Sequence, residues 1–286
     1  MNTGTRLAAL AVAAALLSTT GCSKLRARDQ LNKGVQAYKG GNFELAVEHF
    51  KNAVSYDEDL KVAKMYLATA YTAQYVPGVD TNENLRNAQQ AIDTYKRVLD
   101  GDPDRLMRVN SLKGTAFLYL NMKKFDQARD YYKKAVETDP NDPELYYSLG
   151  VIAWTQAYRD AAEVKANAQM RVDDVLKNKG DEKLCEQLRA KDGKIIEDGM
   201  KMLQTAIDKR QDYDEAMAYL NLLYRRKAND FSCNDPDARA QYNKTADQWT
   251  NKMMEARKTK AAEAAKKNQG GIILEETPTP TPSPSR

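Results

Sequence analysis

Residues Val109 to Pro140, VNSLKGTAFLYLNMKKFDQARDYYKKAVETDP, decide the fold of this chain. Small residues recur there at helical spacing, at Ala116, Ala128 and Ala135, with large residues between them. A small residue where two helices cross lets their backbones approach, and an aromatic residue one turn away fills the remaining gap. The residue before a proline disfavours the α conformation, so Pro140 ends the pattern. The stretch predicts two packed amphipathic helices, with a break near residues 121–124.

The stretch resembles one tetratricopeptide repeat (TPR), a helix–turn–helix unit of 34 residues. That family alternates small and aromatic residues before a proline, and the matching residues here are Ala116, Tyr119, Ala128, Tyr132, Ala135 and Pro140. Leu112 departs from the preferred tryptophan, and Thr115–Ala116 departs from the preferred Leu-Gly. The resemblance implies an all-α, right-handed α-solenoid and says almost nothing about chemistry.

The same register recurs along the chain and predicts about five TPR helix pairs. The expected units are residues 27–60 (first repeat), 61–105 (second, with a loop insertion at 74–84), 109–142 (third), 143–211 (fourth, with an insertion at 156–194), and 214–268 (fifth, with a C-terminal capping helix). Asp235-Pro236 should begin that capping helix, as an N-cap followed by proline at the first helical position.

The second repeat carries the loop insertion. Tyr71 precedes Ala91 by 20 positions, whereas the corresponding pair in the third repeat is 9 apart. Pro77-Gly78 is a turn signal, and Asp80-x-x-Glu83 resembles a capping box that restarts the helix. The apolar loop is interpreted either as a contact site or, preferably, as a segment folded over its neighbouring helix.

The fourth repeat carries the larger insertion, which delays its second helix to about Gly199. Two apolar stripes flank an Asn178-Lys179-Gly180 turn, one at Val164, Ala168, Val172, Val175 and Leu176, the other at Leu184, Leu188, Ile195 and Ile196. We therefore predict that both helices of the repeat extend into a helical hairpin that projects beyond the solenoid.

The N-terminus predicts export. Arg6 precedes an apolar run over residues 7–17, which is shorter than the roughly 20 residues that span a bilayer. Thr19-Thr20-Gly21-Cys22 is similar to a bacterial lipobox, which implies a signal peptide over residues 1–21 and lipidation of Cys22. The alternative is ordinary signal cleavage that leaves a free thiol. Ser23 favours the outer over the inner membrane.

The C-terminal residues 269–286 are rich in Pro and Thr and predict a disordered tail.

Composition argues against catalysis and nucleic-acid binding. Lys plus Arg number 44 against 40 Asp plus Glu in 286 residues, and the net charge of +4 is spread along the chain, without the basic cluster of a nucleic-acid groove. The single histidine, His49, and three cysteines without zinc spacing leave no constellation for an active site. We predict no enzyme activity, no cofactor and no metal.

The TPR resemblance implies a concave face lined by the first helix of each repeat. By register, the candidate protein-binding residues are Leu31, Val35, Tyr38, Met65, Phe117, Leu120, Tyr147, Val151, Trp154 and Leu222. Relatives that clamp a peptide carboxylate place asparagine where Val35, Thr69, Phe117, Val151 and Leu222 stand here. The clamp is absent, and the apolar face would suit a hydrophobic helix or extended segment. The alternative is that these side chains are buried within the chain.

Cys185 and Cys233 are predicted to form a disulfide. The helix after residue 214 should run antiparallel to the returning arm that carries Cys185, and an extended segment at 229–233 would bring Cys233 to a similar height. Export places both in an oxidising compartment. Two free thiols are the alternative.

These observations predict a lipid-anchored TPR scaffold that binds other proteins or peptide segments at the bacterial cell envelope. The resemblance extends to repeat lipoproteins that assist the assembly of outer-membrane or of secretion and pilus complexes, without residues that separate the two. The alternative is a structural envelope lipoprotein that associates with itself.

Overall fold

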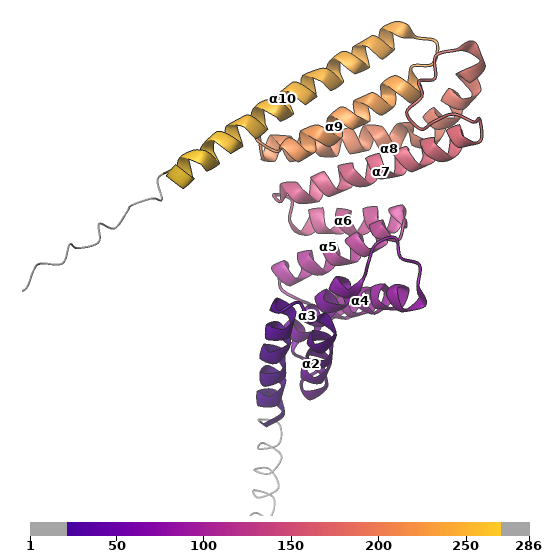
Figure 1. Cartoon of the computed structure of the whole chain (residues 1–286). Helices are drawn as coiled ribbons and strands as arrows, with labels where there is room; N and C mark the ends of the chain where they lie inside the picture. Colours follow the sequence, from indigo (N-terminus) through magenta and orange to yellow (C-terminus); the bar gives the residue numbers. More distant parts are fainter. Residues whose placement is uncertain (1–21, 270–286) are drawn as a thin grey trace, which may run out of the picture. The chain divides into compact units, whose positions relative to one another are not determined.

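The computed structural model describes residues 22–269, so the predicted signal segment 1–21 and almost all of the predicted tail lie outside the described residues. In the described part, the chain is helical and has no strand. The first helices are residues 22–39, α2 (Phe43–Tyr56), α3 (Lys61–Gln74), α4 (Asn82–Asp100), α5 (Arg105–Asn121), α6 (Phe125–Thr138) and α7 (Pro143–Ala166) (Figure 1).

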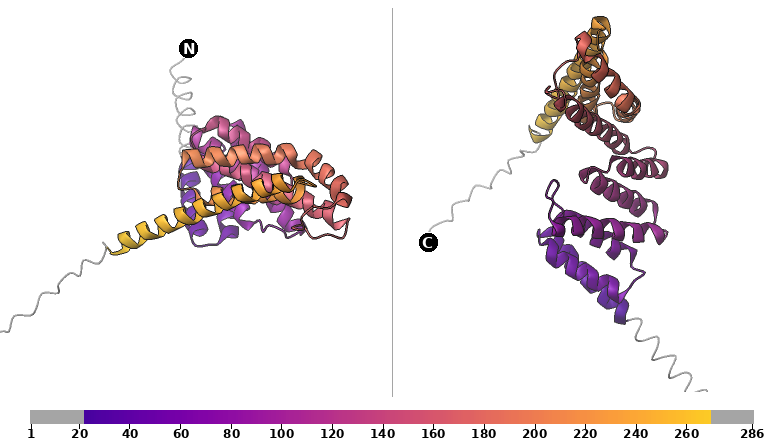
Figure 2. Two further views of the ribbon diagram at one scale, coloured as in Figure 1. Left: turned by 90° about the horizontal axis from the view of Figure 1, so that it is seen from above. Right: turned by 90° about the vertical axis from the view of Figure 1, so that its right-hand side faces the viewer.

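The chain divides into two compact units, residues 1–156 and 157–286, and the boundary falls within α7. The second unit continues with η1 (Lys179–Asp181), α8 (Glu182–Lys209), α9 (Asp214–Arg226), the π-helical turn η2 (Lys227–Phe231) and α10 (Pro236–Gln269). Within it, α9 packs against both α8 and α10 (Figures 1 and 2). Consecutive helices pack against each other within each unit, as α3 does on α4, α5 on α6 and α9 on α10, so the predicted all-α solenoid of helix pairs is confirmed.

Helices α5 and α6 confirm the two helices predicted from the deciding stretch. The turn between them holds Lys123 in the left-handed region, at a φ of 59°. The expected small residues are fully buried at the helix contacts of several pairs, at Ala46, Ala53, Ala68, Ala91, Ala116, Ala128, Ala135, Ala206 and Ala246. Close approach of the helix backbones at small residues therefore organises the core of both units.

Glycine extends this packing rule at two places in the first unit. A Cβ built on Gly34 would lie 2.5 Å from the ring of Phe50, and one built on Gly114 would lie 2.5 Å from the ring of Tyr95. Phe50 is fully buried and stacks on Tyr66, with ring centroids 5.5 Å apart. Because the Phe50 ring is enclosed on all sides, it cannot move to make room for a side chain at position 34.

The variant Gly34→Ala is expected to lower the free energy of unfolding of the first unit by about 1–3 kcal/mol, the usual cost of overpacking a core. Gly193→Ala in α8 is the matched control, because its added Cβ would meet only Arg189 Cγ, at 4.0 Å. That control should stabilise the protein by up to about 1 kcal/mol, since alanine favours a helix interior over glycine. Urea unfolding followed by circular dichroism measures both changes, and equal effects would contradict the packing argument.

The start of α4 differs from the prediction in the residue that caps the helix. The Asp80-x-x-Glu83 capping box is wrong, because the N-cap of α4 is Thr81, whose hydroxyl accepts a hydrogen bond of 3.2 Å from the Asn84 backbone N–H. The predicted N-cap of α10 is confirmed, since Asp235 Oδ1 accepts from the Ala238 N–H at 2.8 Å and the helix begins at Pro236.

The predicted helical hairpin is wrong in its first arm. Helix α7 ends at Ala166, and residues 167–178 form an irregular segment instead of continuing the apolar stripe as a helix. The Leu176 N–H donates to the Asn229 carbonyl at 2.9 Å, so this segment packs onto the end of α9 and η2. The returning arm is helical as predicted, because α8 runs without interruption from Glu182 to Lys209.

The predicted terminal helix is fixed to α9 by an ion-pair cluster. Arg257 Nε lies 2.7 Å from Asp214 Oδ2, and Lys260 pairs with the other carboxylate oxygen of Asp214. Burial alone would raise the pKa of Asp214, but hydrogen bonds from Lys260 and Arg257 lower it to about 2. These contacts hold the middle of α10 against the start of α9.

Candidate functional site

The candidate concave-face residues all lie on the first helix of a pair. They belong to residues 22–39 (Leu31, Val35 and Tyr38), α3 (Met65), α5 (Phe117 and Leu120), α7 (Tyr147, Val151 and Trp154) and α9 (Leu222). Phe117 is 41% exposed and the other nine are partly buried, so none is sealed in the core. Nine of the ten belong to the first unit, and Leu222 belongs to the second.

In the first unit, a residue of the second helix α4 contacts the neighbouring first helices α3 and α5. The hydroxyls of Thr69 and Thr72 on α3 lie 3.4 Å from the Tyr95 hydroxyl of α4. Burial raises the pKa of Tyr95, and its ring fills the space beside Gly114 of α5. A single tyrosine thus fixes the spacing of α3 and α5, the neighbouring helices that carry Met65 and Phe117.

Between α5 and α7, this face also carries fixed charges. Lys113 Nζ lies 3.3 Å from Glu144 Oε2 and 3.5 Å from Asp142 Oδ2. Burial would lower the pKa of Lys113, but Asp142 and Glu144 together raise it above its usual value. The lysine stays charged, and the arrangement offers apolar and aromatic contacts beside a fixed ion pair.

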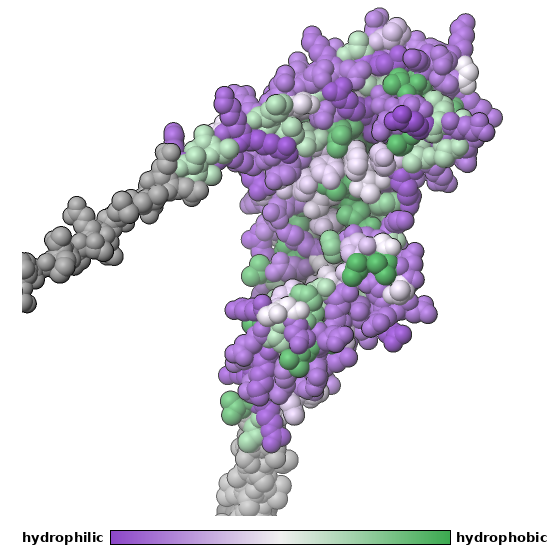
Figure 3. Space-filling model, viewed as in Figure 1, coloured by the Kyte–Doolittle hydropathy of each residue, from purple (hydrophilic) through white to green (hydrophobic). Residues whose placement is uncertain are grey.

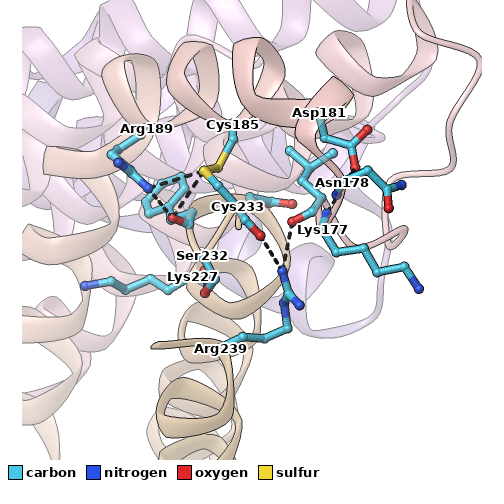
Figure 4. The surroundings of a disulfide bond; sticks show 12 residues. Lys177, Asn178, Asp181, Cys185, Arg189, Lys227, Ser232, Cys233 and Arg239 are labelled. Carbon is cyan, nitrogen blue, oxygen red and sulfur yellow. Dashed lines mark hydrogen bonds between the residues drawn. A yellow bond between two sulfur atoms is a disulfide. The ribbon is translucent and has the colours of Figure 1, made fainter. Parts of the chain in front are cut away.

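The structure joins Cys185 and Cys233 in a disulfide, with Cα atoms 5.9 Å apart (Figure 4). Cys185 lies on α8 and is fully buried, whereas Cys233 follows η2 and is half-buried. The disulfide was predicted to form through an extended segment at residues 229–233. That part of the prediction is wrong, because residues 227–231 form a π-helical turn.

Basic side chains surround the disulfide and hold the chain on both sides of it. Arg189 donates to the Phe231 carbonyl and lies 3.3 Å from Cys233 Sγ. Arg239 of α10 donates to the Cys233 carbonyl at 2.6 Å and to the Leu176 carbonyl at 3.1 Å (Figure 4). The disulfide therefore sits where α8, α10, η2 and the inserted segment meet.

A buried charge cluster at the inserted segment was missed from the sequence. The Lys165 ammonium of α7 is fully buried and pairs with Asp230 of η2, and it also donates to the Val172 carbonyl at 3.0 Å and the Asp174 carbonyl at 2.7 Å. Its three N–H groups therefore have three acceptors. Burial lowers the pKa of Lys165 and raises that of Asp230, because both charged groups lose hydration. The attraction between the two charges acts in the opposite direction on each pKa and is outweighed by burial.

Arg226 of α9 completes the cluster. Its Nε lies 3.3 Å from Asp230 Oδ2, and its Nη2 donates to the Val172 carbonyl at 3.0 Å and to Asp173 Oδ1 at 3.2 Å. The signal in the sequence was the four-residue spacing of Arg226 and Asp230, which is also common on exposed helices. The cluster turns residues 172–174 into part of the core of the second unit.

A second buried group in this unit is the carboxyl pair Asp160 on α7 and Asp192 on α8, both almost fully buried. Burial, and then the nearby Asp160 charge, raise the pKa of Asp192 to about 8. Asp160 Oδ1 lies 3.1 Å from Arg159 and 3.3 Å from Lys191. Asp160 Oδ2 and Asp192 Oδ1 are buried and have no hydrogen-bond partner in the described part of the chain, so a proton on Asp192 would lessen the cost of burying the two carboxyl groups.

This pair predicts a pH-dependent stability. The folded protein keeps a proton on Asp192 that the unfolded chain releases near pH 4, so stability is greatest below pH 4 and falls as the pH rises to about 8. Asp192→Asn should therefore stabilise the second unit by about 1–3 kcal/mol at pH 8, and hardly at all at pH 4, because asparagine keeps the donor without the charge.

Thermal unfolding of Asp192→Asn at several pH values measures this effect. The control is Asp198→Asn, because Asp198 pairs with Lys194 on the exposed surface of α8. A stabilisation by Asp192→Asn that is the same at pH 4 and pH 8 would show that folding does not raise the pKa of Asp192.

The described residues contain no group of three or more acidic, histidine or cysteine side chains arranged to hold a metal ion. Between residues 22 and 269, no helix has both the length and the apolarity to span a bilayer. The features described above are a partly buried apolar face, ion pairs and a disulfide.

Together, the fold and the partly exposed first-helix face define an all-α protein of the helical-repeat class. Residues 118–156 match the family model of the TPR repeat. The DnaJ homolog subfamily C member 7 homolog of Dictyostelium discoideum is 28% identical over 144 residues, which are 48% of this chain and 26% of that protein. The match therefore spans about a quarter of that relative's length.

Solved structures show the same fold. A crystal structure of MamA has a TM-score of 0.55 and 12% identity, with coverage of 88% of this chain and 98% of that chain. MamA 41-end from Desulfovibrio magneticus RS-1 has a TM-score of 0.53 and 17% identity, with coverage of 82% and 96%. These likenesses show the helical-repeat fold of this chain, and the TPR repeat is matched over residues 118–156.

Proposed function

We propose that this protein is a lipid-anchored TPR scaffold that binds other proteins at the bacterial cell envelope. The observation that carries the proposal is the set of apolar and aromatic side chains on the first helices of the repeats, of which Phe117 is 41% exposed and the others are only partly buried. The TPR fold itself supports protein partners in general. Assembly of outer-membrane, secretion or pilus complexes is the role suggested by the resemblance to other repeat lipoproteins.

The first-helix face suits an apolar helix or extended segment. Phe117 provides an exposed aromatic ring, and large aromatic side chains are the residues that contribute most at protein interfaces. Lys113 is held by Asp142 and Glu144, so it does not need a carboxylate from the partner. Recognition here would therefore rest on apolar contact, in agreement with the absent carboxylate clamp.

Cross-linking tests this face. A photoreactive phenylalanine at position 117 should cross-link a partner protein in intact cells, whereas the same group at Tyr56, a 40%-exposed tyrosine on the second helix α2, should not. Phe117→Asp should lower the yield of the partner in a pull-down by about tenfold or more, since each 1.4 kcal/mol of lost binding is tenfold. Equal cross-linking from both positions would count against the concave face.

Lipid anchoring rests on the lipobox-like sequence and on Cys22, which is exposed as the first described residue of its helix. Mass spectrometry of the N-terminal peptide should find acyl chains on Cys22, and Cys22→Ala should release the protein from the membrane fraction. A wild-type protein that stays in the membrane with an unmodified Cys22 would overturn the anchor and leave the scaffold role open.

We further propose that the protein has no catalytic role, because proteins of the TPR-repeat fold are typically interaction scaffolds and not enzymes. A structural, self-associating role predicts a stable oligomer of the unlipidated chain without any partner. Mass measurement in solution separates it from the scaffold, for which we expect a monomer.

A further inference from the structure

The inserted loop before α4 forms a rigid turn. Val76 to Val79 is closed by a hydrogen bond of 3.3 Å from the Val79 N–H to the Val76 carbonyl. Pro77 stands at the second position, and Gly78 has a φ of 82° at the third, which is the pattern of a type II turn. A Cβ on Gly78 would meet no atom within 4 Å, so the turn faces open space.

A single buried side chain fixes this turn. Asn84 Oδ1 accepts from the Val76 N–H at 2.7 Å, and Asn84 Nδ2 donates to the Val76 carbonyl at 2.8 Å and the Val79 carbonyl at 2.6 Å. Tyr75 is buried beside it, at 7% exposure. Together these two residues account for the loop folding over its neighbouring helix, the preferred interpretation of the insertion.

The two valines of the turn are not used to anchor it. Val76 is 54% exposed and Val79 is 41% exposed, although both are strongly apolar. They line a pocket of about 290 Å³ between α2, α3 and α4, together with the amides of Gln74 and Asn87. In Figure 3, an apolar patch lies over the region of the loop between α3 and α4. An apolar pair held rigidly in solvent loses little conformational entropy on binding, which favours a docking role.

The charge around this pocket determines the chemistry of the partner. The pocket is lined by two acidic residues, Glu44 and Glu83, and by no basic residue of the described chain, and Asp80 follows Val79 on the exposed turn. An acidic rim repels a negatively charged segment and attracts a positively charged one. The chain's own apolar triplet Ile272–Leu274 is followed by Glu275 and Glu276, so it has the wrong charge for this surface.

We propose that the Val76–Val79 turn and its pocket, the turn site, bind a partner protein through a short segment in which aliphatic side chains are flanked by lysine or arginine. The aliphatic side chains contact the two valines, and the basic ones pair with Glu44, Asp80 and Glu83. The turn site is formed by the α3–α4 loop and by residues of α2, α3 and α4. It shares no residue with the candidate residues of the first-helix face. Failure of this proposal would leave the proposed scaffold function untouched.

Labelled synthetic peptides test the turn site against residues 22–286 with Cys22→Ser. One peptide carries two leucines flanked by lysines, the second has glutamates in place of the lysines, and the third has serines in place of the leucines. Fluorescence anisotropy should show saturable binding of the first peptide, at least about tenfold weaker binding of the other two, and a similar tenfold loss with Val76→Asp plus Val79→Asp.

Two controls locate the binding. Leu106→Asp on α5 removes another exposed aliphatic side chain of the same unit, at 70% exposure, and should change the affinity less than twofold. Reversal of Glu44 and Glu83 to lysine should weaken binding about tenfold, whereas Asp130→Lys on α6 should not. Absence of saturable binding, equal binding of the glutamate peptide, or a loss caused by Leu106→Asp instead of the valine changes would each overturn the proposal.

Discussion

The variant Asp230→Ala is expected to destabilise the second unit by about 3–5 kcal/mol, the cost of removing one partner from a buried ion pair. Asp230 is almost fully buried and faces both Lys165 and Arg226. Without its carboxylate, two positive charges remain buried with only carbonyls and the exposed Asp173 to balance them. Because the lysine and the arginine also bind the carbonyl of Val172, the inserted segment should detach from α9 and η2 in the same transition.

The double variant Lys165→Met plus Asp230→Ala separates pairing from simple loss of packing. Replacing a buried ion pair with apolar groups is often close to neutral, so the double variant should be less destabilised than the sum of the two single variants. The surface control is Asp198→Ala, which removes an exposed pair with Lys194 and should cost less than about 0.5 kcal/mol.

Tryptophan fluorescence can follow this unit by itself. The chain has two tryptophans, Trp154 in the first unit and Trp249 on α10 in the second. In a Trp154→Phe background, urea unfolding monitored by Trp249 gives the stability of the second unit. An effect of Asp230→Ala no larger than that of Asp198→Ala would show that the cluster is not a stabilising element.

The helix pairs could be predicted from the sequence because one local rule repeats. A small residue at each helix crossing can be recognised in the sequence from its repeated spacing. Ala46, Ala128 and Ala206 are examples, and all three are fully buried. The rule depends only on spacing along a helix, so it needs no knowledge of distant contacts. The same reasoning placed the candidate residues on the first helix of each pair, where the structure has them, but their exposure depends on how neighbouring helices pack.

The inserted segment could not be predicted in the same way. Val172 and Leu176 continue an apolar spacing that suits a helix, yet their backbone carbonyls accept hydrogen bonds from Lys165, Arg226 and Arg239, which lie up to 63 positions away. Tertiary hydrogen bonds therefore override a local helical pattern. The boundary of the two units inside α7 could not be predicted either, since no change in composition marks it in the sequence.

The disulfide is the second feature on which the stability of this unit should depend strongly. It joins residues 48 positions apart, and the chain-entropy model for such a loop gives a stabilisation of about 4 kcal/mol. Reduction, or the double variant Cys185→Ala plus Cys233→Ala, should therefore lower the unfolding midpoint of the second unit markedly. The first unit, which contains neither cysteine, should keep its stability and its Trp154 signal.

Burial of Cys185 adds a kinetic expectation. A reductant must attack one sulfur, and only Cys233 is half-exposed, so Cys185 would have to leave as a thiolate in a fully buried site. Burial disfavours that charge. Reduction in the folded state should consequently be slow, and it should accelerate in urea concentrations that begin to unfold the second unit.

Thiol labelling with and without reductant, followed through a urea series, measures both expectations. The Cys185→Ala plus Cys233→Ala variant is the control, because its midpoint should not respond to reductant. Cys22→Ser in every sample removes the remaining thiol from the count. Full labelling of native protein without reductant would show two free thiols. Reduction at the same rate in native and partly unfolded protein would instead show that the bridge is open to solvent and does not hold η2 against α8.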